Sequence, residues 1–376
     1  MLSLFLFPSC TTSGKGLPSK EDVENYIIKV NDHWQSNHSR HGRAFWDNAV
    51  YHTGNIAAYN ITLIDRYLKF SNDWATRNQW KGAKSNNKAE WKYNYGETDD
   101  YVLFGDWQLC FEVYIDLFEL TGAKDSNKIA RAVEVMNYQM GTSRTDYWWW
   151  ADGLYMAMPV MSKLYQLTGN ELYLKKLDTY FSYAKNIMYD KKTGLFYRDV
   201  KYIYPKHKTN NGKKDFWSRG NGWVFAGLAK TIEELPNDSE YSIQYRQLFI
   251  KMAETLKENQ QDEGYWSRSL LDPLQAPGPE SSGTSLFVYG LLWGINNNIL
   301  PSDEYLPVAL KAWNFLTSVA IDKNGRLGYV QPIGEQAIPG QIVNEHSTSN
   351  FGVGAFLLAA SEMYRYLNKV GNGSTQ

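Results

Sequence analysis

Residues 152–169 read DGLYMAMPVMSKLYQLTG, and small or apolar side chains occupy nearly every position of the first turns. A helix that is hydrophobic on all sides is buried among other elements. The segment ends at a short Leu-Thr-Gly turn. These residues therefore predict an inner helix that begins at Asp152 and is surrounded by other helices.

Five further segments have the same shape, which marks an internal repeat. Each opens near a Gly or an Asp, is rich in small and apolar residues, and ends at a turn. They begin near Gly54, Asp106, Gly220, Gly283 and Gly352. Six amphipathic segments alternate with the six buried ones, as expected of outer helices. These amphipathic segments span residues 19–34, 71–80, 128–140, 171–188, 241–259 and 303–319.

Six buried helices that alternate with six amphipathic helices predict an all-α fold, an (α/α)6 barrel of inner and outer helices. Short turns make neighbouring helices antiparallel, so the inner helices all run the same way. Asp106, Asp152, Arg219 and the turn at residues 282–284 then lie at one end of the ring. Two stacked helical domains are the alternative, but no Pro/Gly/Ser-rich linker divides the middle of the chain.

Long aromatic loops precede several of the predicted inner helices. Loops gathered at one end of a scaffold commonly hold the functional site, so we expect a pocket there. The loops span residues 91–105, 147–150, 197–217 and 266–281.

The composition narrows the class of ligand. The chain of 376 residues has 39 Lys and Arg against 40 Asp and Glu. This balance argues against nucleic acid, which requires a basic surplus or patch. The 14 Trp, 27 Tyr and 16 Phe are the outlying feature. Aromatic faces suit stacking on sugar rings, although we expect many of these residues to build the core between helices.

The first residues, MLSLFLFPSC, resemble the end of a bacterial lipoprotein signal, in which Cys10 would be acylated. This predicts a bacterial protein of the periplasm or cell surface, attached to a membrane through lipidated Cys10. The basic start of such a signal is missing, so a chance apolar N-terminus is the alternative. We expect a leader at 1–18, a single catalytic barrel at 19–370 and a disordered tail at 371–376, in a monomer or dimer. Cys110 is expected to be a buried thiol.

Several common catalytic arrangements are missing from the sequence: the phosphate-binding P-loop, the dinucleotide fingerprint, a metal-binding His pattern and the Gly-x-Ser-x-Gly elbow. Carboxyl groups among aromatic residues remain. Asp152 follows three consecutive Trp residues, and an apolar setting lets a carboxyl keep its proton near neutral pH and act as a general acid. The alternative is that Asp152 only caps its helix.

Asp106 opens the preceding inner helix and has the same two interpretations. Two carboxyls at adjacent helix starts can face each other across a pocket, one protonated and the other charged. Asp99 and Asp100, in the same loop, are competitors for this second position.

The stretch WSRGNGW, residues 217–223, opens another predicted inner helix. Arg219 offers a bidentate fork for a carboxylate, and Trp223 offers a stacking face. The two glycines between them allow a ligand to approach the backbone. A structural alternative pairs Arg219 with Asp215.

Four motifs resemble the unsaturated glucuronyl and rhamnogalacturonyl hydrolases of glycoside hydrolase families 88 and 105, with family 105 the closer. The resemblance runs from about residue 20 to the C-terminus. The motifs are WADGLYM at 150–156, WSRGNGW at 217–223, ESSGTSLFVYGLLWGI at 280–295 and FGVGAFLLAASEMY at 351–364. The resemblance implies an (α/α)6 barrel without metal or organic cofactor. It also implies that the substrates are products of polysaccharide lyases, which have a C4=C5 double bond in their terminal uronate.

The resemblance also implies roles for the two carboxyls. Asp152 would be the general acid/base that protonates C4 and then activates the water that adds at C5. Asp106 matches the family's second Asp, because Gln108, Tyr114 and Leu117 then fall in register. Trp107 departs from the family pattern at this helix, which keeps Asp100 as an alternative.

The candidate substrate-binding residues lie in these motifs or in the aromatic loops beside them. Arg198, in GLFYRD at 194–199, stands where relatives often carry a His. It would bind a second acidic group or a sulfate, or else be a surface residue. The remaining candidates are Trp149, Trp150, Trp217, Asn221, Ser282 and Thr284. Two other functions stay open: a uronate dehydratase or saturated β-glucuronidase on the same fold, and a catalytically inactive sugar-binding lipoprotein.

Overall fold

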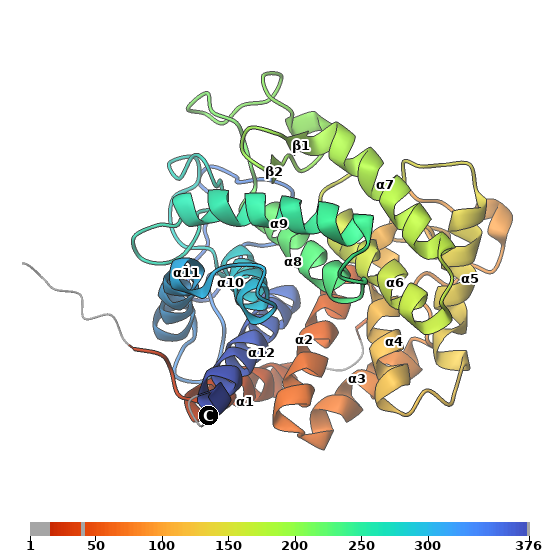
Figure 1. Cartoon of the computed structure of the whole chain (residues 1–376), viewed down its shortest axis with the longest axis horizontal. Coiled ribbons are helices and arrows are strands. Elements are labelled where there is room, and N and C mark those ends of the chain that lie inside the picture. The colour runs from red at the N-terminus through yellow and green to blue at the C-terminus, as the bar shows by residue number, and fades with distance from the viewer. Residues whose placement is uncertain (1–15, 39–41, 374–376) are drawn as a thin grey trace, which may run out of the picture.

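The computed structural model describes residues 16–38 and 42–373 as two concentric rings of helices (Figure 1). The inner helices are α2 (Trp46–Thr62), α4 (Cys110–Leu120), α6 (Gly153–Thr168), α8 (Ser218–Glu233), α10 (Ser281–Asn296) and α12 (Asn350–Gly373). The outer helices are α1 (Lys20–Asn37), α3 (Asp65–Arg77), α5 (Asn127–Gly141), α7 (Leu172–Met188), α9 (Glu240–Glu258) and α11 (Ser302–Phe315).

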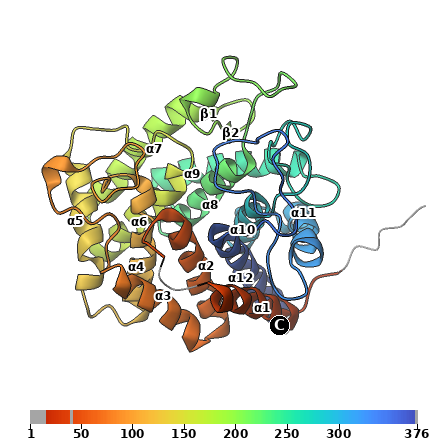
Figure 2. The ribbon, with the colours of Figure 1, turned by 180° about the vertical axis from the view of Figure 1, so that it is seen from behind.

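The inner helices contact one another in chain order, and α12 packs on both α10 and α2 to close the ring (Figure 2). Glycines allow the closing contact, because a Cβ atom on Gly54 would lie 2.2 Å from the carbonyl oxygen of Gly354. Two helices this close exclude any side chain at the crossing point. The predicted (α/α)6 barrel is therefore confirmed.

The loops at the N-terminal ends of the inner helices contain short strands and 3₁₀ turns. The loop between α7 and α8 contains the hairpin of β1 (Tyr189–Asp190) and β2 (Leu195–Phe196), followed by the turn η3 (Val200–Tyr202). Two further 3₁₀ turns, η1 (Lys88–Glu90) and η2 (Gly105–Trp107), lie before α4, and the π-turn η4 (Leu316–Ala320) extends α11. The opposite end of the ring has shorter connections.

Some predicted boundaries were wrong. Helix α2 begins at Trp46, well before Gly54, because polar residues in its first turns hid a buried helix. Helix α3 ends at Arg77, and the positive φ angles of Gln79 and Trp80 stop its continuation. Helix α12 continues to Gly373, beyond the domain end predicted at residue 370.

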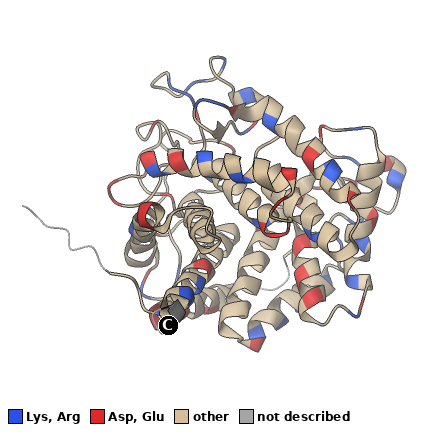
Figure 3. Ribbon diagram, in the orientation of Figure 1, with Lys and Arg blue, Asp and Glu red and all other residues tan. Residues whose placement is uncertain are grey.

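Aromatic side chains fill much of the space between the rings. Seven Trp residues are fully buried, as expected for a core: Trp74, Trp148, Trp150, Trp223, Trp266, Trp293 and Trp313. Cys110 is a buried free thiol, as predicted. Basic and acidic residues are interspersed over the ribbon (Figure 3).

The predicted lipid attachment falls on Cys10, which lies outside the described residues, and it stays a prediction. Within residues 16–38 and 42–373, no helix is long and apolar enough to cross a membrane.

Candidate active site

A cavity of about 130 Å³ opens at the end of the ring where the inner helices begin. The structure brings seven of the predicted residues to its wall. They are Asp106, Trp150, Asp152, Arg198, Trp217, Arg219 and Trp223. They come from four separate loop and helix starts, so the common direction of the inner helices assembles this site.

Asp152 sits at the N-cap position of α6, but its side chain caps nothing. The backbone there is helical, and the capping interpretation is therefore wrong. Its atom Oδ2 lies 3.3 Å from Nε of Arg198. The other oxygen, Oδ1, is buried and has no hydrogen-bond partner among the described residues. A buried acceptor atom that has no hydrogen-bond partner in a cavity wall is available to bind a ligand.

Backbone pairing brings Arg198 to this position. Trp150 and Asp199 form an isolated β-bridge, and the backbone N–H of Ala151 donates to the carbonyl of Arg198 at 2.8 Å. The loop after β2 therefore runs beside the residues that precede α6. This places the Arg198 side chain against Asp152.

Asp106 and Asp152 are both nearly buried, with 7% of each residue exposed. Burial raises the pKa of Asp106 well above its usual range, and the Asp152 carboxylate raises it further. Burial also raises the pKa of Asp152, but the guanidinium groups of Arg198 and Arg219 lower it. The two carboxyls thus titrate as a pair, and Asp106 holds its proton more firmly.

Asp100 requires a correction, because the structure does not bring it to the cavity. Its carboxylate forms an ion pair with Lys92 at 2.6 Å and accepts a hydrogen bond from Thr98. Asp99 likewise accepts from the backbone N–H of Lys84. Both side chains hold the surface turn that precedes the cavity wall, so Asp106 is the second carboxyl of the site.

Arg198 is not a surface residue, since only 13% of its side chain is exposed. Its Nη1 atom lies 2.7 Å from Asp199 and 3.2 Å from Glu335, besides the Asp152 contact. Burial lowers its pKa, but these three carboxylates outweigh burial and leave the pKa raised. The half-buried Trp149 does not line the cavity, and its ring lies 5.8 Å from the Arg198 guanidinium.

Arg219 is 1% exposed and uses two nitrogens to hold a loop. Nη1 donates to the carbonyl of Gln331 at 2.7 Å, and Nη2 donates to that of Pro332 at 2.8 Å. Its Nε has no partner among the described residues. Burial lowers the pKa of Arg219 to about 10, and Glu280 and Asp152 oppose this effect.

The alternative pairing of Arg219 with Asp215 is wrong, because Asp215 binds His207 at 2.8 Å.

The glycines in the motifs make room for Trp rings. A Cβ atom on Gly105 would lie 3.1 Å from the ring of Trp150, and one on Gly153 would lie 3.2 Å from it. A Cβ on Gly220 would lie 2.9 Å from the ring of Trp217. A Cβ on Gly222 would lie 3.0 Å from Leu286, so the expected role of the WSRGNGW glycines, a backbone open to ligand, is corrected to close packing against Trp217 and Leu286.

Three predicted binding residues are structural instead, and none of them lines the cavity. Asn221 accepts from the backbone N–H of Phe196 at 2.8 Å and donates to its carbonyl at 3.0 Å, which fixes β2. Ser282 donates to the Glu280 carboxylate. Thr284 donates to the Glu280 carbonyl at 2.7 Å. These bonds saturate polar groups that are at most 1% exposed.

Sequence reasoning missed one side of the cavity. Arg43, Trp46, Asp47 and Glu97 line it, as do Tyr95, Met156, Ile333 and Gly334. Arg43 forms an ion pair with Glu97, and Asp47 accepts from Asn350 at 2.8 Å. The run Phe-Trp-Asp at 45–47 repeats the aromatic-then-Asp pattern before α6, and would have indicated this helix start. The loop carrying Ile333 shows no such signal.

No group of three or more His, Cys, Asp or Glu in the described part of the chain is arranged to hold a metal ion. The cavity instead combines carboxyls, guanidinium groups and Trp rings. A pocket with aromatic walls, buried carboxyls and guanidinium groups, on a ring of paired helices, is consistent with an enzyme that acts on carbohydrate.

The sequence model of Glycosyl Hydrolase Family 88 matches residues 19–367, and the chain belongs to this family. It is 33% identical to an unsaturated 3S-rhamnoglycuronyl hydrolase of Formosa agariphila, over 93% of this chain and 92% of the relative. A solved family 88 hydrolase from Bacteroides vulgatus is 56% identical, with a TM-score of 0.90 over 93% of this chain and all of that one.

Another solved chain, described as a polysaccharide lyase, is 60% identical with a TM-score of 0.90, over 93% of this chain and 98% of its own. Family membership and the Formosa relative indicate that the protein is a glycosidic hydrolase. It removes unsaturated uronyl sugars from the products of polysaccharide lyases.

Proposed function

We propose that Asp152 is the general acid/base of this hydrolysis, acting on a double bond rather than on the anomeric carbon. The observation that carries the proposal is its buried Oδ1 atom, which lacks a partner in the cavity wall. A carboxyl whose pKa is raised by burial delivers a proton near neutral pH.

The reaction is a hydration. The protonated Asp152 gives its proton to C4 of the enol ether, and positive charge develops at C5 and the ring oxygen. Water adds at C5, and the Asp152 carboxylate takes a proton from that water, which regenerates the acid. The resulting hemiketal collapses and releases the neighbouring sugar. One proton donor suffices, so the separation rule for paired glycosidase carboxyls does not apply.

Substrate binding assists the first step. The uronate brings a negative charge into the cavity, and a like charge raises the pKa of a neighbouring carboxyl. Asp106, which holds its proton, serves as a neutral hydrogen-bond donor beside it. Arg219 is the proposed clamp for the uronate, since its Nε is without a partner and its other nitrogens are fixed.

We propose unsaturated 3S-rhamnoglycuronyl oligosaccharides as the substrate class, since two relatives bear that activity in their names. The second, from an Alteromonas species, is 40% identical over 57% of this chain. Rhamnose is a 6-deoxy sugar with an exposed methyl group. Ile333, at the cavity wall and 66% exposed, offers an apolar contact for such a methyl group.

A closer relationship to family 105 than to family 88 stays a prediction. Solved chains described as family 105 members share 18% to 22% identity with this chain.

The test is to mix the purified protein with lyase-generated oligosaccharides and follow the ultraviolet absorbance of the C4=C5 bond. We expect decay with rhamnoglycuronyl products, and slower or no decay with pectic and glycosaminoglycan products. If the absorbance decays with none of the three classes of oligosaccharide, the proposal is wrong.

An elimination is the second candidate, because the chain described as a polysaccharide lyase is so similar. Incubation with the saturated polysaccharide distinguishes an elimination from the hydrolysis. A lyase or dehydratase would create the C4=C5 bond and raise its ultraviolet absorbance, whereas the hydrolase would leave the absorbance unchanged. Mass spectrometry of the products then identifies the sugar released.

A further inference from the structure

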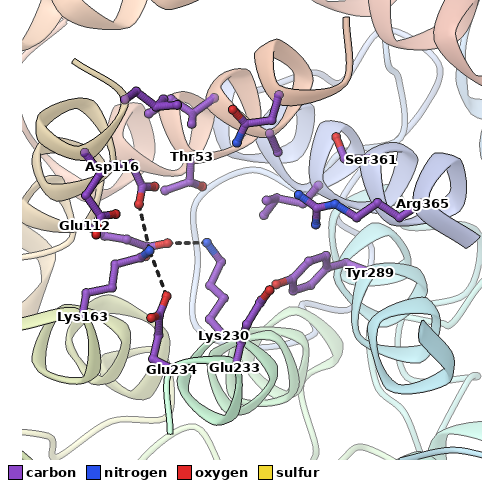
Figure 4. Close-up of a pocket in the computed structure, with 16 residues that line it drawn as sticks. Thr53, Glu112, Asp116, Lys163, Lys230, Glu233, Glu234, Tyr289, Ser361 and Arg365 are labelled. Carbon is purple, nitrogen blue, oxygen red and sulfur yellow. Dashed lines mark hydrogen bonds and ion pairs between the residues drawn. The ribbon is translucent and has the colours of Figure 1, made fainter. Parts of the chain in front are cut away.

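A second and larger pocket lies at the opposite end of the barrel. It has a volume of about 440 Å³ and is lined by residues of all six inner helices (Figure 4). Small-molecule sites typically have volumes of about 300–1,000 Å³. Nothing in the hydrolytic reaction requires this pocket.

A layer of aromatic rings separates the two pockets. Trp223, in the wall of the active-site cavity, packs against Tyr155 in a tilted arrangement with ring centroids 4.8 Å apart. The other face of this layer meets the second pocket, where the Lys230 ammonium lies 5.3 Å from the Tyr155 ring. The second pocket is therefore a separate chamber and not an extension of the first.

The charge of the chamber is negative. Five carboxylates and three basic side chains line it. The basic side chains are already paired. Lys163 contacts Asp116 at 2.8 Å and Glu234 at 3.0 Å, Lys230 pairs with Glu112, and Arg365 pairs with Glu362.

Two of the five carboxylates remain, Glu119 at the exposed rim and the more deeply placed Glu233. Glu233 forms no ion pair with any described residue, and its Oε2 atom accepts only from the Trp293 indole, at 3.2 Å. Burial raises the pKa of Glu233, and so does the Glu362 carboxylate, whereas Arg365 and Lys163, both beyond ion-pair distance, lower it. A desolvated carboxylate without an ion pair of its own in a negative chamber is costly, and a cationic ligand would offset this cost.

Two nearly buried groups also point into the chamber without partners. The Tyr289 hydroxyl makes no hydrogen bond to a described residue, although the residue is only 4% exposed and its ring points toward Glu233 (Figure 4). Atom Oε2 of Glu112, a residue that is 2% exposed, likewise has no partner. Both can accept a hydrogen bond, as Glu233 can.

We propose that this chamber binds a small organic cation with a primary ammonium group. An ammonium has three donors and one positive charge, which match the acceptors of Glu233 and Tyr289. The lining also includes the apolar side chains of Ile56, Ala57 and Leu358, which receive the alkyl part of the ligand. Among the described residues no metal-binding group exists here, which favours an organic cation.

Isothermal titration of the full protein with putrescine, without any sugar, tests the proposal. Since no substrate is present, the result is independent of the proposed hydrolysis. We expect saturable binding with a Kd below about 1 mM. The fully methylated form of putrescine, hexamethyl-1,4-butanediammonium, has the same two charges and the same alkyl chain but no N–H donor, and it should bind at least about tenfold more weakly. Equal binding of the two cations, or no saturable binding of putrescine, overturns the proposal.

Substitutions in the chamber test whether the cation binds beside Glu233. Glu233→Gln removes the charge but keeps an acceptor for Trp293, and it should weaken putrescine binding about tenfold or more. Glu119→Gln, the matched control at the exposed rim, should change the Kd by less than about threefold. Equal effects of the two variants would indicate only a diffuse negative field and overturn the site. If Glu233→Gln does not fold, Tyr289→Phe makes the same comparison by removing one hydroxyl, with weaker binding expected.

Discussion

Atom Nε of Arg198 lies 3.3 Å from Oδ2 of Asp152, at the wall of the active-site cavity. Two opposing effects meet at this contact. Burial favours the neutral carboxyl and raises the pKa of Asp152, whereas the guanidinium favours the carboxylate and lowers it. A residue that must give up a proton and then take one back requires such a balance.

Replacing Arg198 with Met should shift the alkaline limb of the kcat profile to higher pH. The limb reports loss of the proton from the general acid, and removal of a positive neighbour raises the pKa of that acid. The profile is measured from the absorbance decay of the double bond. Arg66→Met is the control, since Arg66 pairs with Asp32 on the surface and should leave the limb in place. A limb that moves to lower pH would contradict the assignment of Asp152 as the acid.

Replacing Asp152 with Asn should lower kcat by about 10²–10⁴-fold, the range for loss of a general acid or base. Substrate binding should persist, because the amide occupies the same volume. Asp100→Asn is the matched control: the same chemical change, in the same end of the molecule, at a carboxylate that pairs with Lys92 outside the cavity. Comparable losses in both variants would mean that the cavity does not contain the reacting carboxyl.

Replacing Asp106 with Asn should stabilise the fold at neutral pH while it lowers activity. The pKa of Asp106 is raised in the folded protein, so the ionised form is disfavoured there relative to the unfolded chain, where the pKa is about 3.9. The wild type therefore loses stability from this group as pH rises above about 4. The amide cannot ionise and avoids that loss.

Calorimetry at pH 4 and pH 8 checks this sign. The Tm of Asp106→Asn should exceed that of the wild type at pH 8, and the difference should shrink at pH 4. A variant less stable than the wild type at pH 8 would show that the charged form of Asp106 is stabilising.

The barrel could be predicted from sequence because its signal is repeated. Helices that are apolar on all sides recur six times, and periodicity is a property of each segment alone. The exception was α2, whose first turns contain Asp47, Asn48 and His52. These polar residues are accommodated by tertiary contacts, such as the bond of His52 to Ser71 at 2.8 Å, which sequence periodicity does not reveal.

The site was predicted only in part, for a related reason. The helix-start motifs located Asp106, Asp152 and Arg219 at one end of the ring, whereas Arg198, in a loop, was named only from the family resemblance. Whether each polar side chain faces the cavity or is held by other protein groups depends on partners that are distant in sequence. Asn221 has the same motif context as Arg219, yet its amide is used entirely by β2 and the turn before α8. The loop that contributes Ile333 is placed by Arg219, so its position follows from the fold.

Replacing Arg219 with Lys should destabilise the protein and loosen that loop. The guanidinium donates to the carbonyls of both Gln331 and Pro332, and a single ammonium on a shorter side chain cannot reach both with the same geometry. Hydrogen bonds from charged donors contribute about 1.5–3 kcal/mol each, so loss of one buried bond should cost about 2 kcal/mol. Stability is read from denaturant unfolding.

Hydrogen exchange locates the effect of this substitution. Amides from residue 329 to residue 341 should exchange faster in Arg219→Lys, whereas those of α10 should not change. KM should rise as well, because the loop carries Ile333 and Gly334 into the cavity wall and the proposed carboxylate clamp is altered. If KM rises without faster exchange in the loop, Arg219 acts on the substrate alone. If exchange increases while KM is unchanged, its role is to anchor the loop, and another cation, such as Arg43, must meet the uronate.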